Sequence, residues 1–322
     1  MLLELVEGIY QLILPLPFRL REVNIYLIKG REGYGLVDTG VNTPETFEAL
    51  EKGLQEIGVG LTDVRSVFMT HYHSDHCGLA GQIKQISGAS LIMESSEAQS
   101  VEAFQITPAE RLHDPGFYDR HGLPTEKFEG IRQIFPYLKS LIYPFEVDHR
   151  IEDGAEIELG DQKFQAIWTP GHTPGHVCLY QPDRKLLFCG DHILMRITPH
   201  IALNSRSTLR NPLAHYLRSL HKITKLDVAF AFPSHGPVMR NPGERVQELL
   251  LHHDRRKEAI LTALGNERKS AHQLSVAIFG NRASYLEDWM AFSETLAHLA
   301  LLVSEDRLEE IWENGRIWYR MK

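Results

Sequence analysis

Four potential metal ligands are crowded into six residues in the first quarter of the chain. Residues 71–76 read His-Tyr-His-Ser-Asp-His and directly follow an apolar segment. Neutral imidazole and carboxylate are the ligand types that zinc and similar divalent cations prefer. His71 and His73 lie two residues apart at the end of an extended segment and should point the same way, whereas Asp75 and His76 follow a turn and can reach a second position. The run therefore predicts metal binding.

Three further segments place a ligand type at the end of a predicted strand. His172 lies in a turn rich in Gly and Pro, Asp191 follows an apolar strand, and His235 follows another. Each of them alone is a weak signal, because a single Asp or His at a strand end is usually structural. Together with residues 71–76 they give seven nitrogen and oxygen ligands. That number suits two metal ions that share a bridging carboxylate and leave room for a water.

The elements that must position these ligands can be read from the hydrophobic pattern. Up to residue 93 strands and helices alternate, which predicts α/β layering, and Thr43-Pro44 marks a helix start. Four later segments rich in β-branched and aromatic residues predict a second sheet. We expect strands at 23–28, 35–37, 64–70, 89–93, 156–159, 164–168, 177–180 and 186–189, and helices at 44–57 and 79–86.

Residues from about 95 to 147 interrupt this pattern with helical segments, expected at 96–105 and 125–138. We interpret this stretch as a helical insert in the first domain. Its aromatic side chains could form a roof over the metals, or they could pack the insert against the sheets; the sequence leaves both open. They are Phe104, Phe117, Tyr118, Phe128, Phe135 and Tyr137.

The last part of the chain has a different pattern. Helices are predicted at 244–264, 270–279 and 287–302, where apolar residues recur at three- and four-residue spacing. Two strands at 307–313 and 316–320 are joined by Asn-Gly, a strong hairpin signal. Three helices followed by a hairpin are typical of a winged helix. No glycine-rich linker precedes the first helix, so a rigid junction is expected.

The ligand segments carry a family resemblance. The Asp38-Thr39-Gly40 turn, the run 71–76, His172, Asp191 and His235 resemble, in their order, the motifs of metallo-β-lactamase-superfamily hydrolases. The resemblance implies that family's αββα sandwich over residues 1–245, with the helical insert at about 95–147. Residues 246–322 resemble the winged-helix domain attached to one clade of the superfamily.

The resemblance also implies roles for individual residues. His71, His73 and His172 would bind the first metal, and Asp191 would bridge to the second. Asp38 would brace the histidine loop through hydrogen bonds. The ligands of the second metal would be Asp75, His76 and His235, and Asp75 and Asp191 are the candidate catalytic residues.

Three more histidines lie near these positions. The family usually has its ligand at the first histidine of the run 172–176, so we expect His176 to be a neighbour of the ligands or a wall of the pocket. His192 and His200 are similar cases. Either one could line the pocket, and either could hydrogen-bond to a loop.

Hydrolysis is the reaction that this chemistry predicts. Two divalent ions can lower the pKa of a shared water from ~15.7 toward ~7, and the bridging hydroxide attacks an electrophilic carbonyl or phosphorus. Asp75 could orient that water or accept its proton. Zinc is the favoured metal, with iron or manganese as alternatives, because these ligands accept several first-row ions.

Within the resemblance, the substrate class is open. A flavodoxin-sized extension and the large nuclease insert are missing from the sequence, which disfavours redox enzymes and large nucleases. We expect a small-molecule carboxylic ester, thioester or lactone. One alternative is a single-strand endoribonuclease or phosphodiesterase. Another, from a different class, is a metabolite-sensing DNA-binding regulator that uses the winged helix.

Charge and composition favour a small-molecule enzyme. Apolar residues make up 43% of the chain, charged residues 24%, and the net charge is -8, which disfavours a dominant nucleic-acid surface. Residues 254–322 hold ten Lys/Arg against eleven Asp/Glu, whereas a module that follows phosphates should be clearly positive. We therefore expect the C-terminal part to serve in packing, homodimer formation or as a wall of the active site.

The N-terminal residues do not show the basic start and apolar run of a signal peptide. No segment approaches the ~20 apolar residues of a membrane span. Three cysteines scattered along the chain do not resemble a disulfide framework. We expect a cytoplasmic protein without a membrane partner.

Overall fold

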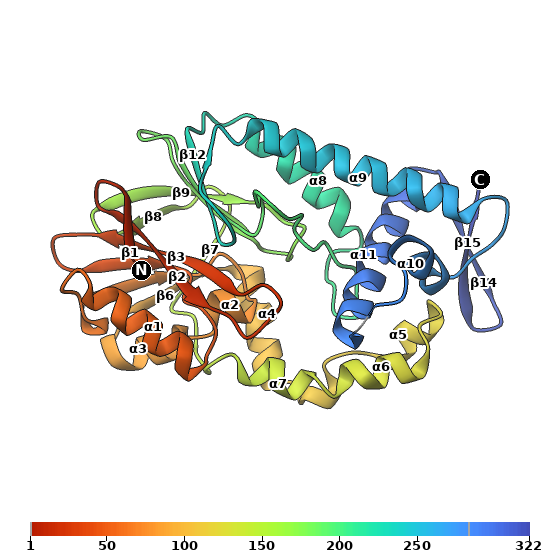
Figure 1. The fold of residues 1–322 in the computed structure, drawn as a ribbon, viewed down its shortest axis with the longest axis horizontal. Helices are drawn as coiled ribbons and strands as arrows, with labels where there is room; N and C mark the ends of the chain where they lie inside the picture. The colour runs from red at the N-terminus through yellow and green to blue at the C-terminus, as the bar shows by residue number, and fades with distance from the viewer. Residues whose placement is uncertain (1, 283) are drawn as a thin grey trace.

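The computed structural model describes residues 2–282 and 284–322, so residue 1 of the predicted first domain and residue 283 of the predicted C-terminal domain lie outside them. Two β-sheets face each other at one end of the molecule, and a helical part occupies the other end (Figure 1). In the described part of the chain, no helix is both long and apolar enough to cross a membrane.

The first sheet has seven strands that follow one another in sequence order. The pairs from β1 to β4 are antiparallel and those from β4 to β7 are parallel. The strands are β1 (Leu2–Val6), β2 (Ile9–Pro15), β3 (Glu22–Lys29), β4 (Tyr34–Val37), β5 (Val64–Phe68), β6 (Ser90–Glu94) and β7 (His149–Ile151).

The second sheet has six strands in the order β13-β12-β11-β10-β9-β8. All neighbouring pairs are antiparallel except β11 and β12, which run parallel. The strands are β8 (Glu156–Leu159), β9 (Gln162–Trp168), β10 (Val177–Gln181), β11 (Leu186–Gly190), β12 (Phe230–Pro233) and β13 (Met239–Arg240).

Helices cover the outer face of each sheet. Helices α1 (Pro44–Gln55) and α3 (Ala80–Ser87) bury Leu50 and Ile83 in the core of the first sheet. Helices α8 (Pro212–Ile223) and α9 (Gly243–Leu264) bury Leu220 and Val246 over the second.

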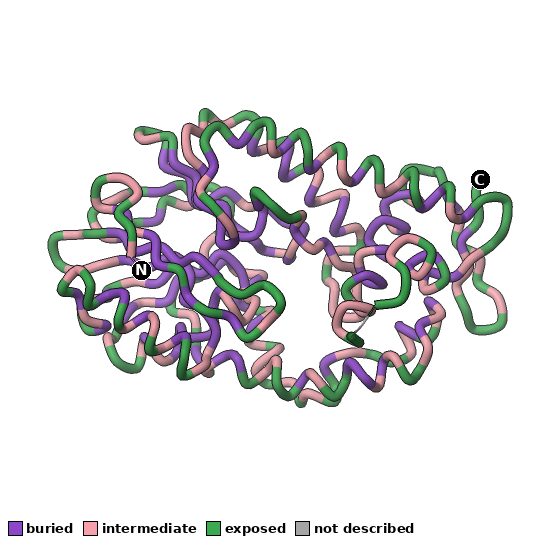
Figure 2. The backbone as a smooth tube through the Cα atoms, viewed as in Figure 1, coloured by how far each residue is buried: buried purple, intermediate pink, exposed green. Residues whose placement is uncertain are grey.

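A third core lies between the sheets, where the rings of Tyr26 and Phe188 lie 5.1 Å apart in an edge-to-face arrangement. Figure 2 shows buried residues concentrated in these layers. The predicted α/β layering is confirmed.

The insert begins on the first sheet, where Ala98 and Val101 of its first helix join the core, and then forms an arm that reaches away from the sheets (Figure 1). Its helices are α4 (Ser95–Ile106), α5 (Pro115–Arg120), α6 (Thr125–Arg132) and α7 (Phe135–Ser140). The single helix expected at 125–138 is wrong: Pro136 has no N–H to donate to the preceding turn, so α6 ends and α7 begins with the proline in its first turn. Tyr118 and Phe128 pack in one core with C-terminal helices, so these two rings do not pack against the sheets.

The C-terminal part begins within α9, whose first turns already lie on the second sheet. Val246 and Leu249 share the core of that sheet, while Ile260 and Leu264 belong to the C-terminal core. One continuous helix therefore joins the two parts. Helices α10 (Ala271–Phe279) and α11 (Tyr285–Ser304) follow, and then the hairpin of β14 (Leu308–Glu313) and β15 (Arg316–Met321).

This order of three helices and a hairpin matches the predicted elements. The assignment of the part as a winged helix, and the boundary at residue 245, stay predictions.

Candidate metal centre

The predicted ligands come together at one edge of the sandwich. His71 and His73 follow β5, and Asp75 and His76 belong to the one-turn helix α2 (Ser74–Cys77). The other ligands lie in the loops after β9, β11 and β12. Strands from both sheets thus end around one site, and the side chains of these loops converge there: His71, His73, Asp75, His76, His172, Asp191 and His235.

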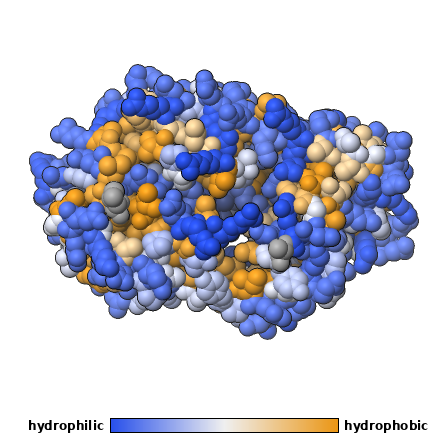
Figure 3. All heavy atoms as spheres, viewed as in Figure 1, coloured by the Kyte–Doolittle hydropathy of each residue, from blue (hydrophilic) through white to orange (hydrophobic). Residues whose placement is uncertain are grey.

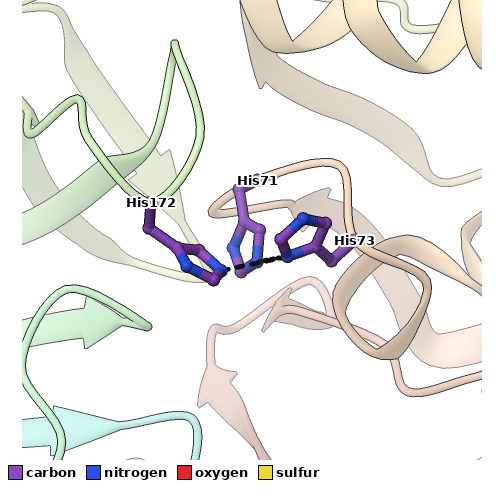
Figure 4. A group of neighbouring side chains, drawn as sticks. All are labelled: His71, His73 and His172. Carbon is purple, nitrogen blue, oxygen red and sulfur yellow. Dashed lines mark hydrogen bonds between the residues drawn. The ribbon is translucent and has the colours of Figure 1, made fainter. Parts of the chain in front are cut away.

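His71, His73 and His172 form what we call the first ligand group. His71 Nε2 lies 3.1 Å from His73 Nδ1, and His172 Nε2 lies 3.0 Å from the same atom. Figure 4 shows the three rings pointing toward one another from two loops that are about a hundred residues apart in the sequence.

Asp75, His76 and His235 form the second ligand group. Asp75 Oδ2 lies 3.5 Å from His76 Nε2 and 3.3 Å from His235 Nε2. The carboxylate therefore lies between the two imidazoles, within reach of an ion that both could bind.

Asp191 lies between the two groups and presents one oxygen to each. Its Oδ2 lies 3.5 Å from His172 Nε2 in the first group. Its Oδ1 lies 3.7 Å from His76 Nε2 and 3.5 Å from His235 Nε2 in the second. This is the arrangement that a bridging carboxylate requires.

Hydrogen bonds fix the outer nitrogens of three predicted ligand rings. His172 Nδ1 donates to the carbonyl of His200 over 2.8 Å, and His235 Nδ1 donates to the carbonyl of Glu22 over 2.9 Å. His76 Nδ1 lies 2.8 Å from a carboxylate oxygen of Asp38. With the proton held on Nδ1, the lone pair of Nε2 points into the site, as metal binding requires.

Asp38 is the centre of this support. It directly follows β4 with φ +62°, a left-handed conformation that is rare for residues with a side chain, and it is 1% exposed. Besides His76, its carboxylate accepts hydrogen bonds from the N–H and hydroxyl of Thr70 and the hydroxyl of Ser234. Because the Thr70 hydroxyl donates to Asp38, it accepts from His71 Nδ1, 3.0 Å away. Asp38 therefore orients ligands of both groups.

Two buried atoms in the site show that a cation fits there. The buried polar atoms that have no hydrogen-bond partner in the described part of the chain include His76 Nε2 and Asp191 Oδ1. Such atoms are costly unless something else satisfies them. Ligands ~2.0–2.1 Å from a tetrahedral zinc ion lie roughly 3.3 Å from one another, close to the 3.0–3.7 Å spacings of the two ligand groups. The residues present thus fit divalent cations.

The electrostatics keep the first ligand group neutral. Burial, as the largest cause, lowers the pKa of His73 and of His172 to about 3 and that of His71 well below its ordinary value. Neutral imidazole is the form that binds metal. In the second group, burial opposes the charge of His76, but Asp75, Asp38 and Asp191 together raise its pKa. The three carboxylates around His76 therefore attract positive charge to this position.

Of the other histidines, His176 has both nitrogens engaged. Its Nε2 accepts the backbone N–H of Asp191 over 3.1 Å, and its Nδ1 lies 2.8 Å from the hydroxyl of Thr169. His192 is buried against the ring of Tyr216. His200 lines the cleft described below and donates from Nε2 to the carbonyl of Met290 in α11 over 3.0 Å. His200 thus connects ligand His172 to the C-terminal part.

A buried carboxylate that the sequence reasoning missed ties the two loops of the first group together. Glu97, in the first turn of α4, accepts hydrogen bonds from the N–H of Tyr72 over 2.8 Å and of Gly175 over 2.6 Å. It is 0% exposed, and burial raises its pKa to about 7. In the sequence, Glu97 looks like any carboxylate near the start of a helix. Only its tertiary contacts show that it supports the site.

The ligands open into a cleft of ≈ 920 Å³. The cleft runs between the sandwich, the insert and the C-terminal helices, and Figure 3 shows the surface hollowed there with apolar residues along its edge. His73, Asp75, His172, Asp191 and His235 line its inner end.

Comparisons with a family model and with a solved structure point to the same family. The model of the metallo-beta-lactamase superfamily matches residues 19–235, the range that holds every predicted ligand. The crystal structure of a metallo-beta-lactamase family protein from Thermus thermophilus superposes with a TM-score of 0.86 and 30% identity, covering 99% of this chain and 100% of that one.

Two curated relatives extend the comparison. The probable metallo-hydrolase YqjP of Bacillus subtilis is 26% identical over 98% of both chains. AacuM of Aspergillus aculeatus, named an atrochrysone carboxyl ACP thioesterase, is 21% identical over 95% of this chain and 80% of its own. The chain belongs to the metallo-beta-lactamase superfamily and is a metal-dependent hydrolase.

Proposed function

We propose that this protein hydrolyses a small-molecule carboxylic ester, thioester or lactone at a dinuclear metal centre. The observation that carries the proposal is the position of Asp191, whose two oxygens face different ligand groups at 3.5–3.7 Å. One carboxylate shared in this way supports two ions close enough to act on one water.

The ions would be held by the first ligand group and the second ligand group, with Asp191 common to both. When bound, two divalent ions supply an activated water and stabilise the negative charge that develops on the substrate. Zinc is our first choice of metal, because the donor set consists of imidazoles and carboxylates at tetrahedral spacing.

The protein's own groups position the reaction. Asp75 lines the cleft, where its carboxylate would orient the attacking water and accept its proton. The water oxygen bonds to the carbonyl carbon, the bond from that carbon to the leaving oxygen or sulfur breaks, and the leaving group takes up a proton. Asp38 and Glu97 keep the ligand loops in place while this occurs.

Among the three ester classes, we favour a thioester. AacuM is named a thioesterase and aligns with nearly the whole chain. A thioester also needs little activation of its leaving group, since a thiolate leaves readily. The mostly apolar cleft walls support an acyl substrate over a phosphodiester, which would demand a positive surface.

A substrate panel tests the proposal. The zinc-loaded protein is assayed with thioesters, lactones, phosphodiesters and short single-stranded RNA, with Asp191→Ala as the inactive control. We expect turnover of at least one thioester by the wild type and its loss in the variant. Cleavage of RNA alone, with a steep dependence on salt, would replace this proposal by the nuclease alternative.

A further inference from the structure

A half-buried arginine in the cleft lacks the carboxylate partner that such arginines usually have. Arg206 is half-buried and lines the cleft. Its guanidinium carbon lies 5.2 Å from the ring centroid of Phe104 and 6.0 Å from that of Tyr72. Within the described part of the chain, no carboxylate forms an ion pair with it, and its one hydrogen bond runs from its backbone N–H to Asn204 Oδ1. The guanidinium thus contacts two aromatic rings, and its N–H groups are free to bind an anion in the cleft.

The place of this charge relates it to the metal centre. Tyr72 lies between His71 and His73 in the sequence, and its backbone N–H is held by Glu97. A guanidinium near the Tyr72 ring therefore lies close to the reacting end of the cleft. Phe104, the other aromatic neighbour of the guanidinium, belongs to the insert helix α4.

The other cationic side chains of the cleft differ from Arg206 in their exposure or their partners, and the lining carboxylates Glu287 and Glu294 pair with Arg19 and Arg256. Arg19 is paired with Glu287 Oε1 at 2.7 Å, and its side chain is 88% exposed. Arg282 is exposed and lies over the ring of Phe279. Burial, and then the charge of Arg206, lower the pKa of His113 to about 3, so that imidazole is neutral. Arg206 is thus the fixed positive charge of the inner, half-buried cleft.

Around this charge the cleft walls are apolar. The insert contributes Phe104, Ile131 and Phe135, and α11 contributes Leu286 and Trp289. The indole N–H of Trp289 donates to the hydroxyl of Tyr118 over 3.2 Å, which fixes the two walls to each other. An apolar chamber whose half-buried cation has no carboxylate partner selects an amphiphile, since a partly desolvated charge is costly until a counter-charge reaches it.

We propose that Arg206 binds an anionic group of the substrate, and that the substrate is an apolar acyl ester or thioester carrying a carboxylate or phosphate. This rests on the proposed function for the reaction itself. The anion could sit on the acyl chain or on the leaving thiol, and both sources would present the same chemistry to the guanidinium.

Two pairs of substrates separate the sources. The first pair is the octanoyl thioester of N-acetylcysteamine and its ω-carboxy analogue. The second pair joins one neutral octanoyl group either to N-acetylcysteamine or to coenzyme A, which bears phosphates. For the zinc-loaded wild type we expect at least one anionic member to have a kcat/KM about 10-fold to 100-fold above its neutral partner.

In Arg206→Met the ratio of kcat/KM between the anionic substrate and its neutral partner should fall toward one, chiefly through a higher KM for the anionic substrate. Arg206→Lys should keep part of the wild-type ratio. Arg218→Met is the matched control, because Arg218 is an exposed arginine on α8 outside the cleft. An equal preference in wild type and Arg206→Met, or no preference for an anion in the wild type, would overturn the proposal.

Calorimetric titration with the amide isosteres of the same compounds separates the two proposals. If no thioester is hydrolysed but the anionic amide binds the wild type more tightly than Arg206→Met, the proposed reaction fails and the role of Arg206 stands. If thioesters are hydrolysed but the amides bind both proteins equally, the role of Arg206 fails and the reaction stands.

Discussion

Glu97 Oε1 accepts a hydrogen bond of 2.6 Å from the backbone N–H of Gly175, which ties the insert helix to the loop that carries His172. The second oxygen of the same carboxylate holds Tyr72, beside His73. Gly175 allows this approach, since a Cβ atom there would collide with Glu94 Oε2. The insert is thus part of the support of the metal centre as well as a wall of the cleft.

Glu97→Gln should loosen that support while leaving the ligands in place. An amide has one acceptor oxygen, so one of the two N–H groups loses its partner, at a cost of about 1–3 kcal/mol. We expect zinc affinity to fall roughly 10-fold to 100-fold, measured by competition with a chromogenic chelator. Glu102→Gln, on the same helix with an exposed ion pair to Arg150, is the control. Equal affinity in both variants would contradict the supporting role of Glu97.

Gly190→Ala should disturb Asp191 through His176. Gly190 has φ +48°, and a Cβ there would lie 2.6 Å from His176 Nε2, the atom that accepts the Asp191 N–H. We expect a loss of about 2–4 kcal/mol in the free energy of unfolding and a lower turnover. Gly88→Ala is matched, because Gly88 has φ +73° and open space around its Cβ position. Denaturant titration measures the free energy of unfolding of both variants. Equal losses would show that the strain of a positive φ is the only effect of Gly190→Ala and that contact with His176 adds nothing.

A histidine pair in the C-terminal part should make stability depend on pH. His253 Nδ1 lies 3.1 Å from His298 Nε2, and His298 Nδ1 donates to the Glu294 carbonyl. Burial is the main cause that lowers the pKa of His253 to about 2 and of His298 to about 3. Between those values and ~6.5 the unfolded chain binds protons that the folded chain excludes. Stability is therefore full above pH ~6.5 and falls as the pH is lowered.

Each histidine should lower the free energy of unfolding by about 1.4 kcal/mol for each pH unit below pH ~6.5. In His298→Gln the decline between pH 6 and pH 5 should be shallower by about that amount. Chemical denaturation at several pH values measures this. Parallel curves for wild type and variant would show that the pair titrates normally in the folded protein.

The residues that lie together at this site could be predicted from the sequence, because each one follows a strand and is of a type that binds metals; their roles as ligands stay predictions. His172, Asp191 and His235 are weak signals singly, and they were singled out by their order along the chain and by the family resemblance. Glu97 and Arg206 could not be predicted in this way. The contacts that single them out join segments far along the chain, and their local sequence is ordinary.

The fold was predictable to a similar extent. Most strands of both sheets and the C-terminal helices lie within a few residues of the predicted positions. The hairpin of β1 and β2 was missed, because its buried and exposed positions do not alternate strictly. Helix α8 was missed although Asn211 caps it and Pro212 begins it. The packing of the insert on the C-terminal helices depends on tertiary structure that no local pattern encodes.

The most direct measurement is the metal content and thioesterase activity of wild type and Asp191→Ala, purified without chelator. We predict about two divalent ions per chain for the wild type, and a folded variant that has lost at least one ion together with its turnover. Circular dichroism checks the fold of both proteins. A wild type without metal, or a variant that turns over substrate at the wild-type rate, would contradict the dinuclear centre.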